Sequence, residues 1–484
     1  MTQSTSQNNF MESKSLIEKA HSALHLRLLS LQQRIINHHA GTVIVIGGGD
    51  RLAASELANQ LTEWLDSRLV RICAPDTSLP ENKLRPFLWP YWNLAPAQGR
   101  ITIIVGDWTT RSVVASINGE LKGDALRSRL KSIKNFEDML VASGIAMAKV
   151  WIDTPEKILK KRLSEAEDTD AEGWVVSARD LLIGKKKNHP HVKTIRTTSS
   201  GKGLPWKVIN GSDSKRRNLV AGKYIADQLN SGLRRKITKV SKPSNRPRGL
   251  LESATAHPVL DKKDYSQQIA KLQWRLGRLT RIAAKRGIST LVVLEGVDAA
   301  GKGGVIRRLA AKLDAAHYHV HPIPAPTPEE KSRHYLWRFW VRVPPYGHMA
   351  IFDRSWYGRV IVERVEGFCR TDEWARAYSE INDFEARQAE VGSIVLKFWI
   401  HISKEEQLRR FQEREKSPHK RHKMTKEDYR NRKKWDDNQR AAEDMIVRTD
   451  TPHAPWIVIP ANDKRYARVA VLKALCRALA DRLD

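Results

Sequence analysis

Residues 290–304 read TLVVLEGVDAAGKGG, an apolar run that leads directly into a glycine-rich turn containing Asp298 and Lys302. Backbone N–H groups of such a turn bind phosphate oxygens, and the lysine neutralises the phosphate that is transferred. The usual motif continues with Ser or Thr as a Mg²⁺ ligand, but here Gly303 follows. Asp298 can supply a metal-binding oxygen instead. The stretch therefore predicts a P-loop, with a structural turn lacking phosphate chemistry as the alternative. The glycines expected to bring amides to phosphate are Gly296, Gly301, Gly303 and Gly304.

Composition narrows the class of protein. The chain has 484 residues, 41% of them apolar, which suffices for two or three packed domains. Its three cysteines show no C-x-x-C spacing, so we expect neither a disulfide framework nor a zinc site. No signal-peptide pattern and no apolar run near 18 residues occur, and we therefore expect a soluble, cytoplasmic protein without a membrane partner. The net charge of +30 predicts a polyanionic partner without choosing among nucleic acid, an anionic membrane and a phosphate-rich substrate.

The second half of the chain repeats the first at an offset of nearly 248 residues. The strand-like run LVVL at 291–294 falls on VIVI at 43–46. The tryptophans in register are Trp337, Trp340, Trp356 and Trp399, which fall on Trp89, Trp92, Trp108 and Trp151. Apolar strand patterns alternate with helical ones in both halves, which predicts parallel sheets covered by helices. The chain is therefore expected to hold two tandem P-loop kinase-like α/β domains.

The two copies differ where the chemistry is expected. Lys302 corresponds to Ala54 and Asp353 to Val105, so the first copy lacks both the cation and a candidate metal ligand. We therefore expect a disordered tail at 1–15, a degenerate and inactive domain at 16–230, a Ser/Pro/Lys/Arg-rich linker at 231–258 and a catalytic domain at 259–484.

A second acidic position follows another predicted strand. MAIFDRSWYGR at 349–359 is an apolar run that ends in Asp353. In P-loop enzymes, an aspartate at this place holds the metal, although a strand-capping role is the simpler alternative. Arg354 and Arg359 offer planar donors for phosphate oxygens, unless they form ordinary surface ion pairs.

The segment 416–434 carries nine Lys or Arg residues against two acidic ones. Such a run is often only a solvated surface. Its place after the P-loop core suggests a lid, spanning about 403–445, that covers the phosphates and excludes water. Its charge exceeds what one nucleotide triphosphate needs, which favours a longer polyanion. Tyr429 is its only aromatic residue, so base stacking by a nucleic-acid-binding protein is not favoured.

Four motifs together resemble the second family of polyphosphate kinases. They are EGVDAAGKGG at 295–304, APTPEE at 325–330, FDRSWYGRVIVERVEGF at 352–368 and RTDTPHAPWIVIPANDKRYAR at 448–468. The resemblance covers the whole second half and, in degenerate form, the first. It implies Mg²⁺-dependent, in-line transfer of the terminal phosphate of inorganic polyphosphate to AMP, giving ADP.

The resemblance also implies roles for individual residues. Asp298 and Asp353 would hold Mg²⁺, and Lys302 with the loop amides would hold the transferring phosphate. Arg354 and Arg359 would orient the acceptor nucleotide. Further phosphate contacts would come from Arg410, Lys433, Lys434, Lys464 and Arg465.

Other functions stay open from the sequence. The acceptor could be a nucleoside diphosphate, or the donor ATP, as in ordinary nucleotide kinases. A nucleic-acid-binding protein with a relict P-loop is a third reading, and we expect no nucleic-acid partner. A homo-oligomer is compatible with the sequence.

Overall fold

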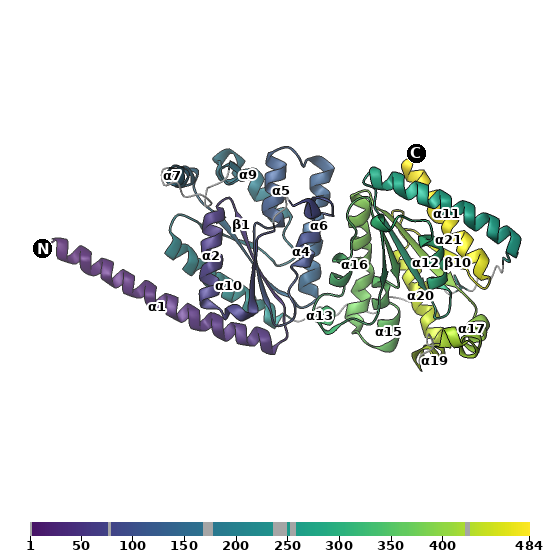
Figure 1. Ribbon diagram of the computed structural model, residues 1–484. Coiled ribbons are helices and arrows are strands. Elements are labelled where there is room, and N and C mark those ends of the chain that lie inside the picture. Colours follow the sequence, from purple (N-terminus) through teal and green to yellow (C-terminus); the bar gives the residue numbers. More distant parts are fainter. Residues whose placement is uncertain (1, 76–78, 168–177, 236–248, 252–257, 422–425) are drawn as a thin grey trace. The chain divides into compact units, whose positions relative to one another are not determined.

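The computed structural model describes residues 2–484 apart from 76–78, 168–177, 236–248, 252–257 and 422–425. The chain divides into two units, each with one five-stranded sheet (Figure 1). The first unit lies within residues 1–77, 90–238 and 327–337, and the second within 78–89, 239–326 and 338–484. Each unit therefore includes a short segment from the other half of the chain.

These inserted segments are held by equivalent backbone hydrogen bonds. Within the first unit, the N–H of Gln98 donates to the carbonyl oxygen of Ser332 at 2.8 Å. Within the second unit, the N–H of Tyr346 donates to the carbonyl oxygen of Leu84, also at 2.8 Å. The two pairs are related by the repeat offset of 248 residues, so the duplication extends to the way each unit incorporates its borrowed segment.

Both sheets are parallel and have the same strand order. The strands are β1 (Thr42–Gly48), β2 (Val70–Cys73), β3 (Ile101–Val105), β4 (Ala146–Asp153), β5 (Trp206–Asn210), β6 (Thr290–Gly296), β7 (Tyr318–Pro322), β8 (Met349–Asp353), β9 (Ile394–His401) and β10 (Trp456–Pro460). The first sheet has the order β2-β3-β1-β4-β5 and the second β10-β9-β6-β8-β7. Read from the opposite edge, the second order is the repeat of the first. The predicted tandem α/β fold is confirmed.

The helices of the first half are α1 (Thr2–Asn37), α2 (Arg51–Trp64), η1 (Ser67–Leu69), α3 (Pro80–Lys83), α4 (Trp89–Asn93), α5 (Trp108–Ile117), α6 (Gly123–Ala142), α7 (Glu156–Glu167), α8 (Ala178–Gly184), η2 (Lys186–Asn188), α9 (His189–Thr198) and α10 (Ser214–Arg234). Those of the second half are α11 (Lys262–Lys285), α12 (Lys302–Ala310), η3 (Ala315–His317), α13 (Pro328–Lys331), α14 (Trp337–Trp340), η4 (Trp356–Arg359), α15 (Val362–Glu366), α16 (Thr371–Glu390), α17 (Lys404–Lys416), α18 (Pro418–Arg421), α19 (Lys426–Lys433), α20 (Trp435–Thr449) and α21 (Lys464–Leu483).

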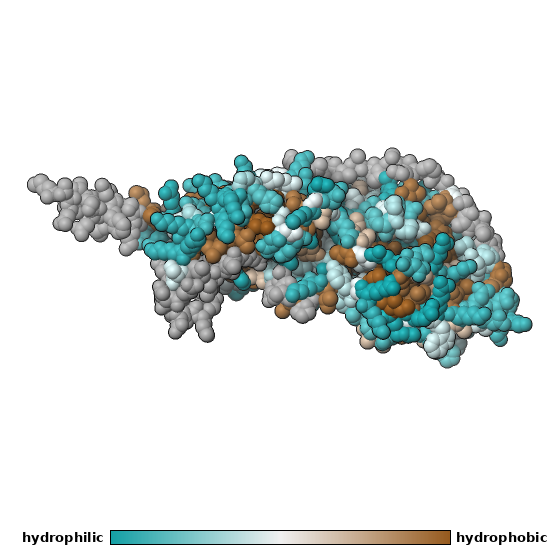
Figure 2. Space-filling view, turned by 90° about the horizontal axis from the view of Figure 1, so that it is seen from above, coloured by the Kyte–Doolittle hydropathy of each residue, from teal (hydrophilic) through white to brown (hydrophobic). Residues whose placement is uncertain are grey.

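Helices cover both faces of the second sheet. The central strand β6 is buried from Thr290 to Glu295, as expected for a parallel strand with helices on both sides. Helices α11, α12 and α21 pack against one face, and α16 lies on the other (Figure 1). Phe384 of α16 meets Trp340 and Trp356 there in edge-to-face contacts. On the face of the molecule shown in Figure 2, hydrophilic residues are spread over the described surface with apolar residues between them. Because helices cover both faces of the sheet, the strand ends that carry the predicted site rest on a rigid core.

One glycine in each unit permits a close approach of neighbouring strand ends. Gly48 has φ +127° and Gly296 has φ +140°, a region that residues with a Cβ rarely adopt. A Cβ on Gly296 would lie 2.4 Å from the carbonyl oxygen of Ile400, and one on Gly48 would lie 2.1 Å from that of Ile152. This approach lets the loop begin immediately beyond the strand.

Gly296→Ala is expected to lower the free energy of unfolding by about 2–4 kcal/mol, because it adds backbone strain and a collision with Ile400. Gly303→Ala is the matched control, since a Cβ there meets nothing within 4 Å and the residue lies in α12. It should be neutral or stabilise by up to about 1 kcal/mol. Urea unfolding of both variants measures the difference, and equal midpoints would contradict this account.

Two expected boundaries differ from the structure. Residues 2–15 continue α1 rather than forming a disordered tail. The buried residues Leu24, Leu28 and Leu31 anchor the C-terminal half of this helix, and extending a formed helix costs far less than nucleating one. In the expected linker, Leu251 is buried, and its N–H and that of Gly249 donate to the carboxylate of Glu443. Residues 236–248 and 252–257 of the linker lie outside the described residues.

Among the described residues, no helix is both long and apolar enough to span a bilayer.

Candidate functional site

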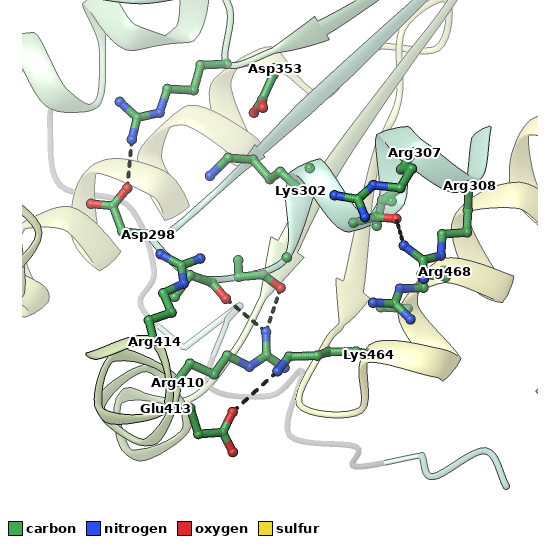
Figure 3. Close-up of a pocket in the computed structure, with 18 residues that line it drawn as sticks. Asp298, Lys302, Arg307, Arg308, Asp353, Arg410, Glu413, Arg414, Lys464 and Arg468 are labelled. Atoms are coloured by element: carbon green, nitrogen blue, oxygen red, sulfur yellow. Dashed lines mark hydrogen bonds and ion pairs between the residues drawn. The ribbon is translucent and has the colours of Figure 1, made fainter. Parts of the chain in front are cut away.

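A cavity of about 610 Å³ opens at the carboxyl end of the second sheet (Figure 3). Its wall comes from the loop after β6, from the start of α12, from the end of β8, and from α17 and α21. The cations that line it are Lys302, Arg307, Arg308, Arg354, Arg410, Arg414, Lys464 and Arg468, and the acids are Asp298, Asp353 and Glu413. Such an excess of positive charge in a concave site favours an anionic ligand.

The glycine-rich loop turns sharply before α12 begins. Ala299 has φ +62° and Gly301 has φ +115°, and the helix starts at Lys302. The Lys302 ammonium donates to the carbonyl oxygens of Gly296 at 2.6 Å and Val297 at 3.3 Å. Burial and the neighbouring Arg354 lower the pKa of Lys302. The helix N-terminus and this ammonium together form a site suited to phosphate.

The two predicted acidic residues line the same cavity. Asp298 forms an ion pair with Arg354 at 2.7 Å and accepts a hydrogen bond from Asn431 at 2.9 Å. Burial acts to raise the pKa of Asp298, but Arg354 and Lys302 outweigh it and hold that pKa below the usual value. Asp353 is shown together with Asp298 and Lys302 in Figure 3. The turn that follows Asp353 is thus tied to the loop through its arginine.

The residues present fit Mg²⁺ only when a substrate shares the ligation. In the described part of the chain, no group of three or more His, Cys, Asp or Glu side chains could hold a metal. Asp298 and Asp353 offer two carboxylates at the cavity. Mg²⁺ is commonly bound by one or two carboxylates together with substrate phosphates and water, so this donor set suits it.

Arg410 reaches the cavity but its donors are used within the protein. The guanidinium donates to the carbonyl oxygens of Ala299 at 3.0 Å and Ala300 at 2.8 Å, and to those of Ala461 and Asn462. Its Nε is paired with Glu406. In the structure Arg410 therefore fixes the loop from behind, and its phosphate contact stays a prediction.

Four other predicted residues do not line this cavity in the described structure. Arg359 is paired with Glu363 at 3.2 Å, and Arg465 donates to the carbonyl oxygen of Leu260. Lys434 is paired with Glu366 at 3.1 Å, and Lys433 lies beside it at the end of α19. The end of the basic segment is thus ion-paired with α15, where Glu366 meets both Arg430 and Lys434, and residues 422–425 lie outside the described residues.

Four arginines of the cavity were missed from the sequence. Arg414 lies one helical turn after Arg410, and Arg468 lies one turn after Lys464. Arg307 and Arg308 lie in the second turn of α12. For Arg414 and Arg468 the signal was present as i,i+4 spacing from a predicted residue, because residues four apart share one side of a helix.

A smaller cavity of about 90 Å³ adjoins the first and shares Asp298 and Arg354 with it. Its other lining residues are Glu295, Gly296, Val297, Gly358, Ile361, Val362, Trp399, Gln407, Asn431, Trp435 and Asn438. Glu295 is buried, and burial raises its pKa although Lys302 acts in the opposite direction. The Asp298–Arg354 pair therefore separates a strongly cationic cavity from one lined by apolar, aromatic and amide groups.

The first unit has lost this arrangement. Helix α2 begins at Arg51, immediately after Asp50, so the positions equivalent to the loop are helical. Asp50 caps this helix and is bound by Thr154 and Arg162 at 2.6 Å. Ala54, at the place of Lys302, is buried in the core. The residues at the places of Arg307, Arg308, Asp353, Arg354 and Arg414 are Asn59, Gln60, Val105, Gly106 and Ala166. Near the C-terminus the offset is 250 residues, as Pro455–Trp456 on Pro205–Trp206 shows, and Lys464 and Arg468 fall on Ser214 and Asn218.

Comparison with known proteins gives consistent matches over nearly the whole chain. The family model Polyphosphate kinase 2 (PPK2) matches twice, at residues 11–236 and 259–483. The chain is 40% identical over 477 residues to a polyphosphate:AMP phosphotransferase of Pseudomonas aeruginosa, covering 96% of each protein. It is 35% identical to one of Acinetobacter johnsonii, covering 95% of this chain and 96% of the relative. A crystal structure described as polyphosphate kinase 2 from Pseudomonas aeruginosa PA01 matches with a TM-score of 0.84 and 39% identity, covering 97% of this chain and 96% of the other. The chain belongs to the polyphosphate kinase 2 family.

Proposed function

We propose that the second unit transfers the terminal phosphate of inorganic polyphosphate to AMP, giving ADP. The observation that carries the proposal is the cavity at the loop, where cations extend from Lys302 well beyond the reach of one phosphate group. The full-length relatives with polyphosphate:AMP activity in their names support the choice of donor and acceptor.

The donor would lie in the larger cavity. Lys302 and the loop amides hold the terminal phosphate, and Arg308, Arg414 and Arg468 contact the phosphates behind it. Arginine suits this task because its planar fork can bind two phosphate oxygens at once. No nucleophilic side chain is required, since in-line transfer depends on positioning and on neutralising charge.

Asp298 and Asp353 would hold Mg²⁺, which would supply positive charge to the transferring phosphate when bound. In the structure Arg354 is paired with Asp298. Its guanidinium lines both cavities, so on leaving the carboxylate it can bind phosphate on either side. Arg354 would thus lie beside the phosphate that is transferred.

The acceptor would enter from the smaller cavity. Trp399 and Trp435 offer flat apolar surface to a nucleobase, and Gly358 leaves space beside them. Asn431 and Asn438 supply amide hydrogen-bonding groups. These features suit a nucleoside, with its phosphate directed at the Asp298–Arg354 pair.

The proposal is tested by ADP formation from AMP with Mg²⁺ and polyphosphate, run against ATP as donor. Polyphosphate-dependent turnover of AMP is the expected result. Turnover with ATP alone would make the protein an ordinary nucleotide kinase. A parallel assay with ADP and GDP tests the second candidate, and preference for either over AMP would overturn the choice of acceptor.

Arg468→Ala is expected to raise the KM for long-chain polyphosphate by about 5- to 30-fold with a smaller change in kcat, because a charge-assisted phosphate contact is worth about 1–2 kcal/mol. Lys434→Ala is the matched control, since that ammonium is paired with Glu366 outside the cavity. KM values measured with chains of defined length show whether polyphosphate lies along the cavity arginines. An equal effect of both substitutions would instead indicate that it lies along the basic segment 416–434.

A further inference from the structure

The turn that follows β8 is strained at Arg354. This residue has φ +66°, in the left-handed region that costs a non-glycine residue about 1–2 kcal/mol. The equivalent residue of the first unit is Gly106, with φ +76°, which adopts this conformation without strain. In both units the N–H of this residue donates to the central strand, at Leu294 in the second and at Ile46 in the first. The second unit therefore needs a further contact to hold its turn.

Glu295 supplies that contact. It is the penultimate residue of β6, is 5% exposed, and accepts a hydrogen bond from the Ser355 hydroxyl at 2.8 Å. Ser355 in turn accepts a hydrogen bond from the N–H of Tyr357 and begins η4. The residue that directly follows Arg354 is thereby fixed.

In the first unit a carboxylate also lies between the strand and the turn, but it belongs to the turn residue and not to the strand residue. Gly47 stands at the place of Glu295 and Asp107 at that of Ser355. A Cβ on Gly47 would lie 2.5 Å from the Asp107 carboxylate, so the acid fills the space that the strand side chain leaves. Asp107 is bound by the N–H of Thr109 and by the hydroxyl of Thr110. Only the unit with a charged arginine at the turn carries its carboxylate on the strand.

We propose that Glu295 is a positioning residue for phosphoryl transfer: through Ser355 it holds the left-handed turn that presents Arg354 to both cavities. The inference rests on the proposed function, because Arg354 is the group through which it acts. The negative charge of Glu295 also lies near the Arg354 and Lys302 cations, together with those of Asp298 and Asp353, so its loss would weaken the attraction that offsets the repulsion between these two cations.

The test is a double-mutant cycle in the full chain. Glu295→Gln keeps an oxygen for Ser355 but removes the charge, and Ser355→Ala removes the hydrogen bond. Each is expected to lower kcat by about 10- to 100-fold, as losses of supporting contacts commonly do. In an Arg354→Met background, neither should lower kcat further by more than about twofold. Equal factors with and without Arg354 would overturn the proposal, as would wild-type kcat in Glu295→Gln.

A swap variant separates positioning from general disruption. Glu295→Gly combined with Ser355→Asp reproduces the arrangement of the first unit and should be at least about tenfold more active than Glu295→Gly alone. No recovery in a protein with wild-type thermal unfolding would count against the proposal. Asp107→Asn, the matched change in the first unit, should leave kcat unchanged.

Binding keeps this test distinct from that of the proposed function. The Kd for polyphosphate, measured by tryptophan fluorescence, does not depend on the acceptor. Glu295→Gln should weaken binding several-fold with Arg354 present and have no effect in Arg354→Met. If the wild-type protein fails to phosphorylate AMP, the proposed function is wrong. The role of Glu295 would still be decided by whether the effect of Glu295→Gln on the Kd for polyphosphate requires Arg354.

Discussion

Lys302→Met is expected to lower kcat for ADP formation by about 10³-fold while the protein stays folded. The ammonium at the start of α12 is the cation that the geometry brings to the transferring phosphate, and in a buried site such a charge is worth several kcal/mol. Methionine keeps the length and apolar stem of the side chain. Initial rates with AMP and polyphosphate, together with thermal unfolding, measure the effect, and a rate near that of the wild type would refute the assignment.

Ala54→Lys in the first unit is the matched opposite change. It should create no activity in the Lys302→Met background, because α2 already fills the place of the loop and Val105 offers no carboxylate. Since Ala54 is 4% exposed, the lysine would also be buried without a partner. We expect the variant to lower the unfolding temperature of the first unit. Any gain of turnover would show that this unit retains a usable site.

The fold could be predicted because its decisive features are local in the sequence. Two apolar runs that each end in glycine, 248 residues apart, determine both central strands, and tryptophans in register establish the duplication. Contacts between residues far apart in the sequence could not be predicted. The hydrogen bonds from Gly249 and Leu251 to Glu443 join positions nearly 200 residues apart, and no pattern in the linker indicates them.

The site residues also fall into a group that the sequence could predict and a group that it could not. Asp298, Lys302 and Asp353 follow strands, and the carboxyl ends of parallel strands meet at one edge, so their convergence was predictable. Residues on helices depend on rotational phase instead. Lys464 lines the cavity, whereas Arg465, one residue and about 100° further around α21, donates to Leu260. Charge density alone could not separate these neighbours.

Asp353→Asn should lower kcat by about 10²- to 10³-fold and raise the Mg²⁺ concentration needed for half-maximal rate. A neutral amide is a poorer Mg²⁺ ligand than a carboxylate. The change disturbs few other contacts, because the Asp353 carboxylate accepts no hydrogen bond from the residues that the structure describes and acts on Lys302 and Arg354 through its charge alone. Its loss should therefore leave the free energy of unfolding within about 0.5 kcal/mol of the wild type.

Asp298→Asn provides the comparison that tests this reasoning. That carboxylate binds both Arg354 and Asn431, so its replacement disturbs the arginine and the α19 contact as well as the metal. We expect Asp298→Asn to change the KM for polyphosphate in addition to kcat and the Mg²⁺ dependence, whereas Asp353→Asn should leave that KM unchanged. Mn²⁺ binding in the presence of polyphosphate, followed by electron paramagnetic resonance, reports the metal directly. Unchanged Mn²⁺ affinity in both variants would show that the two aspartates serve the turn and the loop rather than a metal.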